Sequence, residues 1–519
     1  MIRLLTRAAL ACALALAVAA PARAQTFPTD NPVLRHIWSL GEDSSQAESL
    51  LQTLSDSIGP RLTGTPPQAS GEAWLLARYA QWGIPARKEQ YGTWKGWRRG
   101  ATHIDLIAPR VRTLDGTMMA WSPGTKGNVD GDVMLLPQGS TAEEFAKLLP
   151  SVKGKFVMIS QPEPTCRPDS SWIHWGGPAM YDSLVARRSA DSTSWAARLT
   201  NTGASAKELP VKLEQAGALG VLSARWSRGW GVDKIFNART LAVPQLLLGC
   251  EDYSLVARLV SHGQHPRIRV NAQADMLGDV PVFNVVAEMK GSEKPNEYVM
   301  LSAHFDSWDG SSGSTDNGTG TAVMMEAMRI LKRAYPNPKR TILIGDWSGE
   351  EEGLVGSKAF AADHPEIISG LQALFNQDNG TGRIAHISMQ GFTGAGAFFA
   401  KWMAVLPSEL TKGVEMDNPG FPSGGGSDNA SFVCYGAPSF GLGSDPWDYG
   451  IYTWHTNRDT YDKVAFDNVR ANAVLVASLA YLASEDSARV GRERRVVMPA
   501  GREWPACTPP PRKFDDWTR

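Results

Sequence analysis

The sequence predicts an α/β fold, in which a mostly parallel central sheet is flanked by helices and interrupted by an inserted β-rich domain. Two short apolar runs, residues 299–301 and 341–344, have the composition of buried strands. Residues 319–335 between them carry apolar side chains at helical spacing. Strand, helix and strand in this order form a βαβ unit, which builds parallel sheets. The insert is indicated by a change in composition from residue 110 to about residue 275.

Side chains of the kind that bind metals follow each of the two apolar runs. His304 and Asp306 follow the first run, Asp316 comes at the end of the next glycine- and serine-rich loop, and residues 350–352 (Glu-Glu-Glu) follow the second run. Taken singly, a His-x-Asp pair can be structural, an acidic run often begins a solvated helix, and Asp-Asn in a glycine loop is often a turn. Their occurrence together at strand ends, where open α/β sheets place their chemistry, favours a metal site.

Two later stretches add to this group of ligands. Residues 371–379 form another apolar run that contains Asp378 at its end, and residues 454–460 contain His455. The predicted ligands are then two imidazoles and three carboxylates: His304, Asp316, Glu351, Asp378 and His455. Oxygen and imidazole ligands without thiolate suit zinc, or manganese or cobalt in its place. Five ligands are more than one catalytic zinc needs, and they suffice for two ions if one carboxylate bridges them.

In this order the motifs resemble those of the zinc-dependent exopeptidases of the bacterial leucyl aminopeptidase, carboxypeptidase Q and glutamate carboxypeptidase group. Many relatives in that group carry an inserted protease-associated domain. The resemblance implies two Zn²⁺ ions per chain with Asp316 as the bridge. One ion would be held by His304, Asp316 and Asp378, and the other by Asp316, Glu351 and His455.

The resemblance also assigns the residues that would act beside the metals. Glu350 would be the general base, because Glu352-Gly353-Leu354 occupies the family's x-Gly-Leu after the base and the ligand. Asp306 would orient His304 through its other ring nitrogen. The implied reaction is hydrolysis of a terminal peptide bond by a water that bridges the two ions.

The sequence departs from the family pattern near residue 424. The family has Ser-Asp-His where this chain has Ser-Asp-Asn at 427–429. Gly424 stands where the aminopeptidase branch carries a tyrosine that helps to hold the oxyanion. Tyr449 and Tyr452 are the candidates to replace it.

Several functions remain open on this evidence. We expect an aminopeptidase, and the alternative is a carboxypeptidase or dipeptidase like carboxypeptidase Q. Glutaminyl cyclisation on the same fold is disfavoured by the bridging Asp316. A non-catalytic, receptor-like binding protein is disfavoured because the complete ligand set is present. The preferred side chain, the peptide end that is held and the oligomeric state are not predicted.

The first 24 residues read as a secretory signal peptide, with early arginines, an apolar run and Ala22-Arg23-Ala24 before the cleavage point. We therefore expect a secreted or periplasmic protein. The apolar run is short for a membrane anchor, and no later stretch is long and apolar enough to cross a bilayer. Two disulfides in any of three pairings, or four free thiols, are compatible with Cys166, Cys250, Cys434 and Cys507.

The 519 residues suggest two domains. We expect a discontinuous peptidase domain, residues 25–109 plus 276–486, with the protease-associated insert at 110–275 and a C-terminal tail at 487–519. Residues 162–208, rich in Trp, Ser and Arg, are expected to form a loop. The net charge of −1 gives no reason to expect nucleic acid or an anionic membrane as a partner. The expected partner is a peptide substrate.

Overall fold

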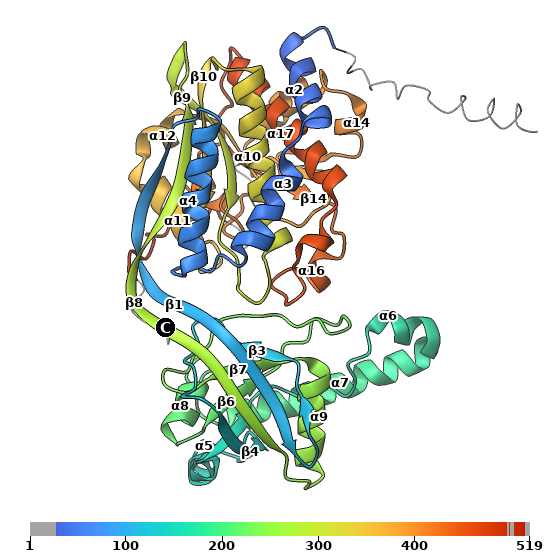
Figure 1. Cartoon of the computed structure of the whole chain (residues 1–519). Helices are drawn as coiled ribbons and strands as arrows, with labels where there is room; N and C mark the ends of the chain where they lie inside the picture. Colours follow the sequence, from blue (N-terminus) through green and yellow to red (C-terminus); the bar gives the residue numbers. More distant parts are fainter. Residues whose placement is uncertain (1–26, 28, 496–497, 499–502, 514–519) are drawn as a thin grey trace, which may run out of the picture.

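The computed structural model describes residues 27, 29–495, 498 and 503–513, so the predicted signal peptide lies outside the described residues. Within them the chain forms two lobes that are joined by a long two-stranded ribbon (Figure 1). The predicted α/β class is confirmed, because a 14-stranded sheet runs through the molecule and helices cover it.

The sheet of the first lobe has the order β13-β12-β14-β11-β9-β10-β8. Its centre is parallel, since β9 pairs in parallel with both β10 and β11, and β11 pairs in parallel with β14. The strands β8 and β12 run antiparallel to their inner neighbours. The bounds are β8 Arg267–Met289, β9 Lys294–His304, β10 Arg340–Trp347, β11 Leu371–Asn376, β12 Ile384–Ser388, β13 Glu415–Asp417 and β14 Ser439–Ser444.

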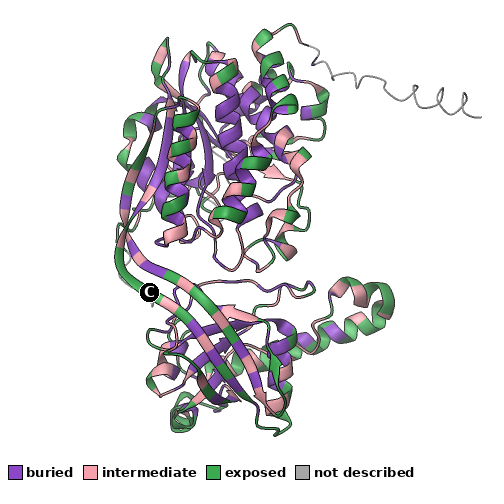
Figure 2. Cartoon of the chain, viewed as in Figure 1, coloured by how far each residue is buried: buried purple, intermediate pink, exposed green. Residues whose placement is uncertain are grey.

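Helices cover both faces of this sheet. The predicted helix over 319–335 is present as α10 (Thr319–Ala334), which packs against α17 (Phe466–Glu485) and α2 (Pro32–Asp43) on one face. On the other face, side chains of α11 (Val355–Asp363) and α12 (Pro365–Gly370) form a separate core. Every residue of β10 and β11 is buried, as expected of central strands that are covered on both faces (Figure 2).

A ribbon of two long strands leads from the first lobe to the second. The strand β1 (Ala86–Ala108) pairs antiparallel with β8 along its whole length, from Ala86 opposite Ala287 to Ala108 opposite Arg267. The predicted boundary at residue 275 lies on this ribbon, where Asp275 pairs with Arg98, and residue 110 follows the end of β1. The division into domains at 110 and 275 stays a prediction.

The second lobe has a small parallel sheet with helices around it. The strands β4 (Val129–Leu135), β5 (Lys155–Met158), β6 (Gly220–Ser223) and β7 (Gln245–Leu248) are parallel, and β3 (Gly116–Met118) closes the edge antiparallel to β7. The strand β4 also pairs with the first half of β8, so both lobes share one sheet. The helices are α5 (Ala142–Leu148), α7 (Gly177–Thr200), α8 (Leu209–Gln215) and α9 (Cys250–Ser261).

The expectation that residues 162–208 form a loop is wrong. The 24-residue helix α7 runs through this segment and is preceded by the short helices α6 (Asp169–Ser171) and η3 (Trp172–Gly176). Only two of its side chains, Leu184 and Arg188, are buried, so the helix projects from the lobe (Figure 1). A helix with so little buried surface has no clear apolar stripe, which explains why its periodicity was missed.

The four cysteines of the described chain form two disulfides. Cys166 pairs with Cys250 inside the second lobe, and Cys434 pairs with Cys507 of the tail. The described tail residues lie on the surface of the first lobe, where Arg512 forms an ion pair with Asp363. None of the helices in the described part of the chain combines the length and the apolar character that are needed to cross a bilayer.

Candidate metal centre and active site

The predicted ligands come together at the carboxyl ends of the parallel strands β9, β10 and β11. His304 is the last residue of β9, Glu351 follows β10 by four residues, and Asp378 follows β11 by two residues. The strands are in register there, since Trp347 at the end of β10 pairs with His304. Strand ends that meet at one edge of a sheet place their following loops side by side.

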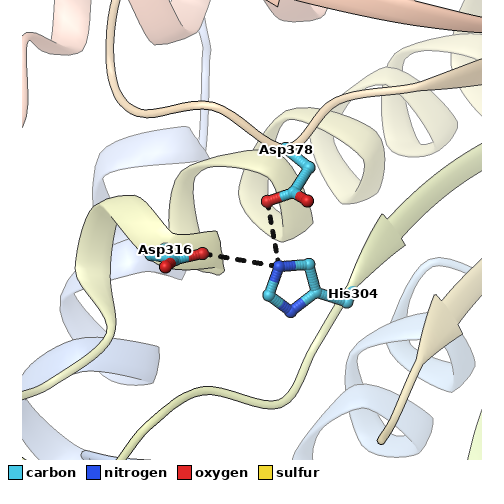
Figure 3. Close-up of side chains that lie close together, drawn as sticks. All are labelled: His304, Asp316 and Asp378. Carbon is cyan, nitrogen blue, oxygen red and sulfur yellow. Dashed lines mark hydrogen bonds and ion pairs between the residues drawn. The ribbon is translucent and has the colours of Figure 1, made fainter. Parts of the chain in front are cut away.

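The first cluster contains His304, Asp316 and Asp378 (Figure 3). The Nε2 atom of His304 lies 2.9 Å from Oδ1 of Asp378 and 3.5 Å from Oδ1 of Asp316. All three side chains are almost completely enclosed. Burial lowers the pKa of His304, but the carboxylates around it outweigh that effect and hold its pKa well above the ordinary value.

The second cluster shares Asp316 with the first and adds Glu351 and His455. The Nε2 atom of His455 lies 2.9 Å from Oε2 of Glu351 and 3.3 Å from Oδ2 of Asp316. His455 comes from the loop after helix α16 (Tyr449–Tyr452), and its φ of 57° lies in the left-handed region, which is uncommon for a residue with a side chain. The two oxygens of Asp316 therefore face two different imidazoles.

These residues fit a pair of zinc ions. Two oxygens in the clusters, Oδ2 of Asp316 and Oε1 of Glu351, are buried without a hydrogen-bond partner among the described residues. Oxygen and imidazole nitrogen bind zinc at 2.0–2.2 Å, so tetrahedral ligands of one ion lie about 3.3 Å apart. The separations of 2.9–3.5 Å within the clusters agree with that spacing. A bound cation would also offset the cost of burying so many carboxylates together.

The three adjacent glutamates point to different places. Glu351 belongs to the second cluster, whereas Glu350 lines the cavity in front of both clusters and joins neither. Glu352 accepts a hydrogen bond of 2.7 Å from the hydroxyl of Thr63 and does not line that cavity. This arrangement agrees with the predicted register, in which Glu350 is the base and Glu351 the ligand.

The environment of Glu350 favours its protonated form. Burial is the main cause that raises the pKa of this carboxyl well above its ordinary value, and the nearby Asp378 and Asp428 raise it further. A carboxyl group with a raised pKa holds a proton more readily, which suits a group that must accept a proton and release it again.

Asp306 connects His304 to the glutamates. Its Oδ1 lies 3.5 Å from Nδ1 of His304, and its own backbone carbonyl lies 3.1 Å from the same nitrogen. Its two carboxylate oxygens also accept hydrogen bonds of 3.3 Å from the backbone amides of Glu350 and Glu351. Asp306 thus contacts both the histidine ring and the loop after β10. The sequence predicts only the first of these two contacts.

Two supporting residues were missed by the sequence analysis. Asp459 accepts hydrogen bonds from the amides of Thr315 and Asp316, at 2.8 and 2.9 Å, and so fixes the loop that carries the shared carboxylate. The signal for it was present, because Asp459 is the aspartate of the His-Thr-x-x-Asp-Thr motif around His455. Arg61 is buried and donates to the carbonyls of Phe305 and Gly313, at 2.7 and 2.8 Å. No sequence motif around Arg61 indicated that it supports the site.

The second lobe contributes no side chain to the two clusters, but it holds the loop that carries His455. The amide of Ile235 donates to the carbonyl of His455 at 2.7 Å, and the ring of Phe236 lies 5.3 Å from the His455 ring. The ammonium group of Lys234 donates to the carbonyls of Gly450 and Trp454, at 3.1 Å each. The uncommon backbone conformation of His455 is therefore supported from the other lobe.

Replacing Lys234 with glutamine should weaken the second ion selectively. The change removes both long-range hydrogen bonds to the loop of His455, and we expect an effect near the lower end of the roughly 10–100-fold change in metal affinity that follows loss of a group bonded to a ligand directly. A stepwise zinc titration against a chelator should show one weakened step and one unchanged step. Lys212→Gln is the control, because Lys212 bonds within its own lobe to the carbonyl of Thr202. Equal weakening of both steps would contradict the selective effect.

A cavity of about 540 Å³ opens in front of the two clusters. Besides five acidic and imidazole side chains of the site, it is lined by the glycines 424–426, Asn379, Tyr449 and Trp454. Burial and the nearby charge of Asp316 raise the pKa of the Tyr449 hydroxyl well above its ordinary value. Tyr452 does not line this cavity, and its ring packs against Gly229 of the second lobe. Of the two predicted tyrosines, Tyr449 alone faces the site.

The strand order, the cavity at the strand ends and the shared carboxylate are features that suit a metallopeptidase. A family model agrees, since residues 284–480 match peptidase family M28. The chain carries a domain of this family, and it is an enzyme of the hydrolase class, as the sequence predicts. The predicted family is confirmed.

Proteins of known name resemble the chain over most of its length. Carboxypeptidase Q from Mus musculus is 24% identical over 447 residues, which are 86% of this chain and 87% of the relative. Carboxypeptidase Q from Homo sapiens is 24% identical over 454 residues, which are 86% of each chain. These matches support the predicted class of metallo-exopeptidase.

Solved structures show the same fold. A peptidase M28 precursor from Shewanella amazonensis superposes with a TM-score of 0.64 at 23% identity, covering 88% of this chain and 97% of that one. BSAP, a zinc aminopeptidase from Bacillus subtilis, has a TM-score of 0.53 at 18% identity, covering 86% and 96%.

Proposed function

We propose that the protein is an exported, zinc-dependent exopeptidase that holds two Zn²⁺ ions and hydrolyses terminal peptide bonds. The observation that supports this most is the position of Asp316, whose two oxygens face the imidazoles of two separate clusters. A carboxylate placed in this way can bridge two ions. The names of the similar proteins, carboxypeptidase Q and zinc aminopeptidase, agree with the reaction class.

The two ions have separate ligand sets in this proposal. His304 and Asp378 would hold one ion together with Asp316, and Glu351 and His455 would hold the other with the same aspartate. When bound, zinc supplies a Lewis acid that polarises the scissile carbonyl and makes a water molecule more acidic.

The remaining steps belong to side chains of the chain itself. Glu350 takes the proton from the attacking water and delivers it to the leaving amine, since its carboxyl group lines the substrate cavity and its pKa is raised. Asp306 keeps His304 in one orientation and fixes the amides of the loop that carries Glu350. Tyr449 would donate a hydrogen bond to the oxyanion, in the place of the tyrosine that this chain lacks at position 424.

Tyr449→Phe should lower kcat by about 10²–10³-fold, which is the usual effect of removing one oxyanion donor. Zinc content should be unchanged, because tyrosine is not a ligand in either cluster. Tyr452→Phe is the matched control and should behave like the wild type. If both variants keep full kcat, the oxyanion is held by another group, such as the backbone of the glycines at 424–426.

Export is proposed from two observations. Residues 1–24 have the pattern of a signal peptide, with the apolar run at residues 8–20. The two disulfides fit an oxidising compartment outside the cytoplasm.

The reaction is tested with the purified, zinc-loaded protein and short peptides whose ends are free or blocked. We expect hydrolysis of one terminal bond and its loss on removal of zinc. Acetylation of the amino end should abolish cleavage by an aminopeptidase, and amidation of the carboxyl end should abolish it for a carboxypeptidase. Cleavage of internal bonds in doubly blocked peptides would overturn the exopeptidase proposal.

A further inference from the structure

A second cavity lies in the second lobe, away from the metal clusters. Its volume is about 620 Å³, which is within the range of about 300–1,000 Å³ that is typical of ligand pockets. It opens at the carboxyl ends of the parallel strands β5 and β6, through residues 159–161 and 223–225. Ligands of α/β sheets bind at such strand ends. We call this cavity the basic pocket.

The charged residues that line the basic pocket are all cationic. They are Lys207, Arg225 and Arg239, and no aspartate or glutamate occurs among the described residues that line the pocket. Burial lowers the pKa of the Arg225 guanidinium. The candidate metal site, in contrast, is crowded with carboxylates. An anion is the ligand that complements this cationic lining.

Apolar side chains, together with neutral polar ones, form the remaining walls of the pocket. The indole of Trp195 is fixed by a hydrogen bond of 3.1 Å from its Nε1 to the carbonyl of Ile159, and Leu199 and Leu209 lie beside it. The guanidinium carbon of Arg225 lies 4.5 Å from the centre of the Phe236 ring, which keeps the cation along one wall. The ligand that fits therefore has an apolar body as well as an anionic group.

The basic pocket adjoins the candidate active site through one side chain. Phe236 lines the pocket, and the same ring lies 5.3 Å from the ring of His455. An extended peptide advances about 3.3 Å per residue, so a pocket that is separated from His455 by one aromatic ring lies within the length of a short peptide. Its carboxyl end offers both the anionic group and an apolar side chain.

We propose that the basic pocket binds an organic carboxylate on an apolar body, and that this carboxylate is the carboxyl end of the peptide substrate. Arginine is suited to this role because its planar guanidinium matches a carboxylate with two parallel hydrogen bonds. The site itself is independent of catalysis, whereas its assignment to the substrate rests on the proposed function.

Binding is tested first, with a carboxylate that has no peptide bond. Titration of the zinc-loaded protein with 4-methylpentanoate, followed by calorimetry, should show saturable binding, and the uncharged 4-methylpentanol should bind at least about tenfold more weakly. Arg225→Gln and, independently, Lys207→Gln should each weaken the carboxylate by about tenfold. Arg187→Gln is the matched control, because Arg187 lies on the same lobe with its side chain 69% exposed and outside the pocket.

The results distinguish binding of the carboxylate in the basic pocket from binding at the metal clusters. If both pocket variants bind the carboxylate as the wild type does, the carboxylate binds at the metal clusters and the proposal is overturned. If the alcohol binds as well as the carboxylate, the pocket is merely apolar, and the proposal also fails.

The source of the carboxylate is tested with peptide acids and their amides. In the wild type, kcat/KM should favour the acid about tenfold or more, and Arg225→Gln should bring the two values close together. An unchanged preference in Arg225→Gln would overturn the assignment to the substrate, even if 4-methylpentanoate binding depends on Arg225. A protein that binds the carboxylate but hydrolyses no peptide would refute the proposed function and leave the binding site standing.

Discussion

Replacing Glu350 with glutamine should lower kcat by about 10²–10⁴-fold, which is the usual contribution of a general base. The amide keeps the shape of the side chain but cannot accept the proton of the attacking water. Zinc content should stay near that of the wild type, because Glu350 lines the cavity without joining either cluster. Single-turnover kinetics and elemental analysis of the same preparation measure both quantities.

Glu351→Gln provides the matched comparison, since it makes the same chemical change one residue further along. Here the amide replaces an anionic ligand 2.9 Å from the imidazole of His455, so zinc affinity should fall. Excess zinc should restore part of the activity in Glu351→Gln and none in Glu350→Gln. The opposite pattern would show that Glu351 is the base and Glu352 a ligand, although the hydrogen bond of Glu352 to Thr63 argues against it.

Asp316→Ala should have the largest effect on metal binding, because one carboxylate serves both clusters. Its oxygens lie 3.5 Å from the imidazole of His304 and 3.3 Å from that of His455. We expect elemental analysis after dialysis to approach two zinc ions per chain for the wild type and to fall well below one for this variant. Activity should be lost with the metals.

Asp378→Ala is the control for this prediction, since Asp378 belongs to the first cluster alone. It should weaken one ion and spare the other. If Asp316→Ala also retains one tightly bound zinc, the shared carboxylate is not a bridge. A fully active wild-type preparation with a single zinc per chain would contradict the two-ion proposal altogether.

Three of the five candidate ligands could be predicted from the sequence because they lie at or soon after the end of a strand that local composition reveals, whereas Asp316 and His455 come from loops next to helices. His304, Glu351 and Asp378 all come at or soon after the ends of apolar runs. Adjacent parallel strands end at the same edge of a sheet, so these side chains are expected to lie close together. The same argument could not find Arg61. Two of its partners are the backbone carbonyls of residues 244 and 252 positions away, and every residue type has such a carbonyl, so the sequence does not reveal the contact.

Helix α7 shows where the spacing of apolar residues fails to predict a helix. Its sequence is polar on nearly all sides because the helix projects from the second lobe and buries two residues. Helix and loop compositions overlap when so little surface is buried, and the segment was therefore expected to be a loop. The disulfide pairing was equally open, since three pairings satisfy the same four cysteines.

The sequence by itself determined the fold class, the family and the set of residues that meet at the strand ends, because these depend on patterns within short segments. Only the tertiary structure decided how the second lobe contacts the site. The contacts of Lys234, Ile235 and Phe236 with the loop of His455 join positions about 220 residues apart. The basic pocket likewise collects its cations from two separate loops, Lys207 from the loop before α8 and both Arg225 and Arg239 from the loop between β6 and β7. Contacts of this kind arise from the docking of complete elements, which no local pattern encodes.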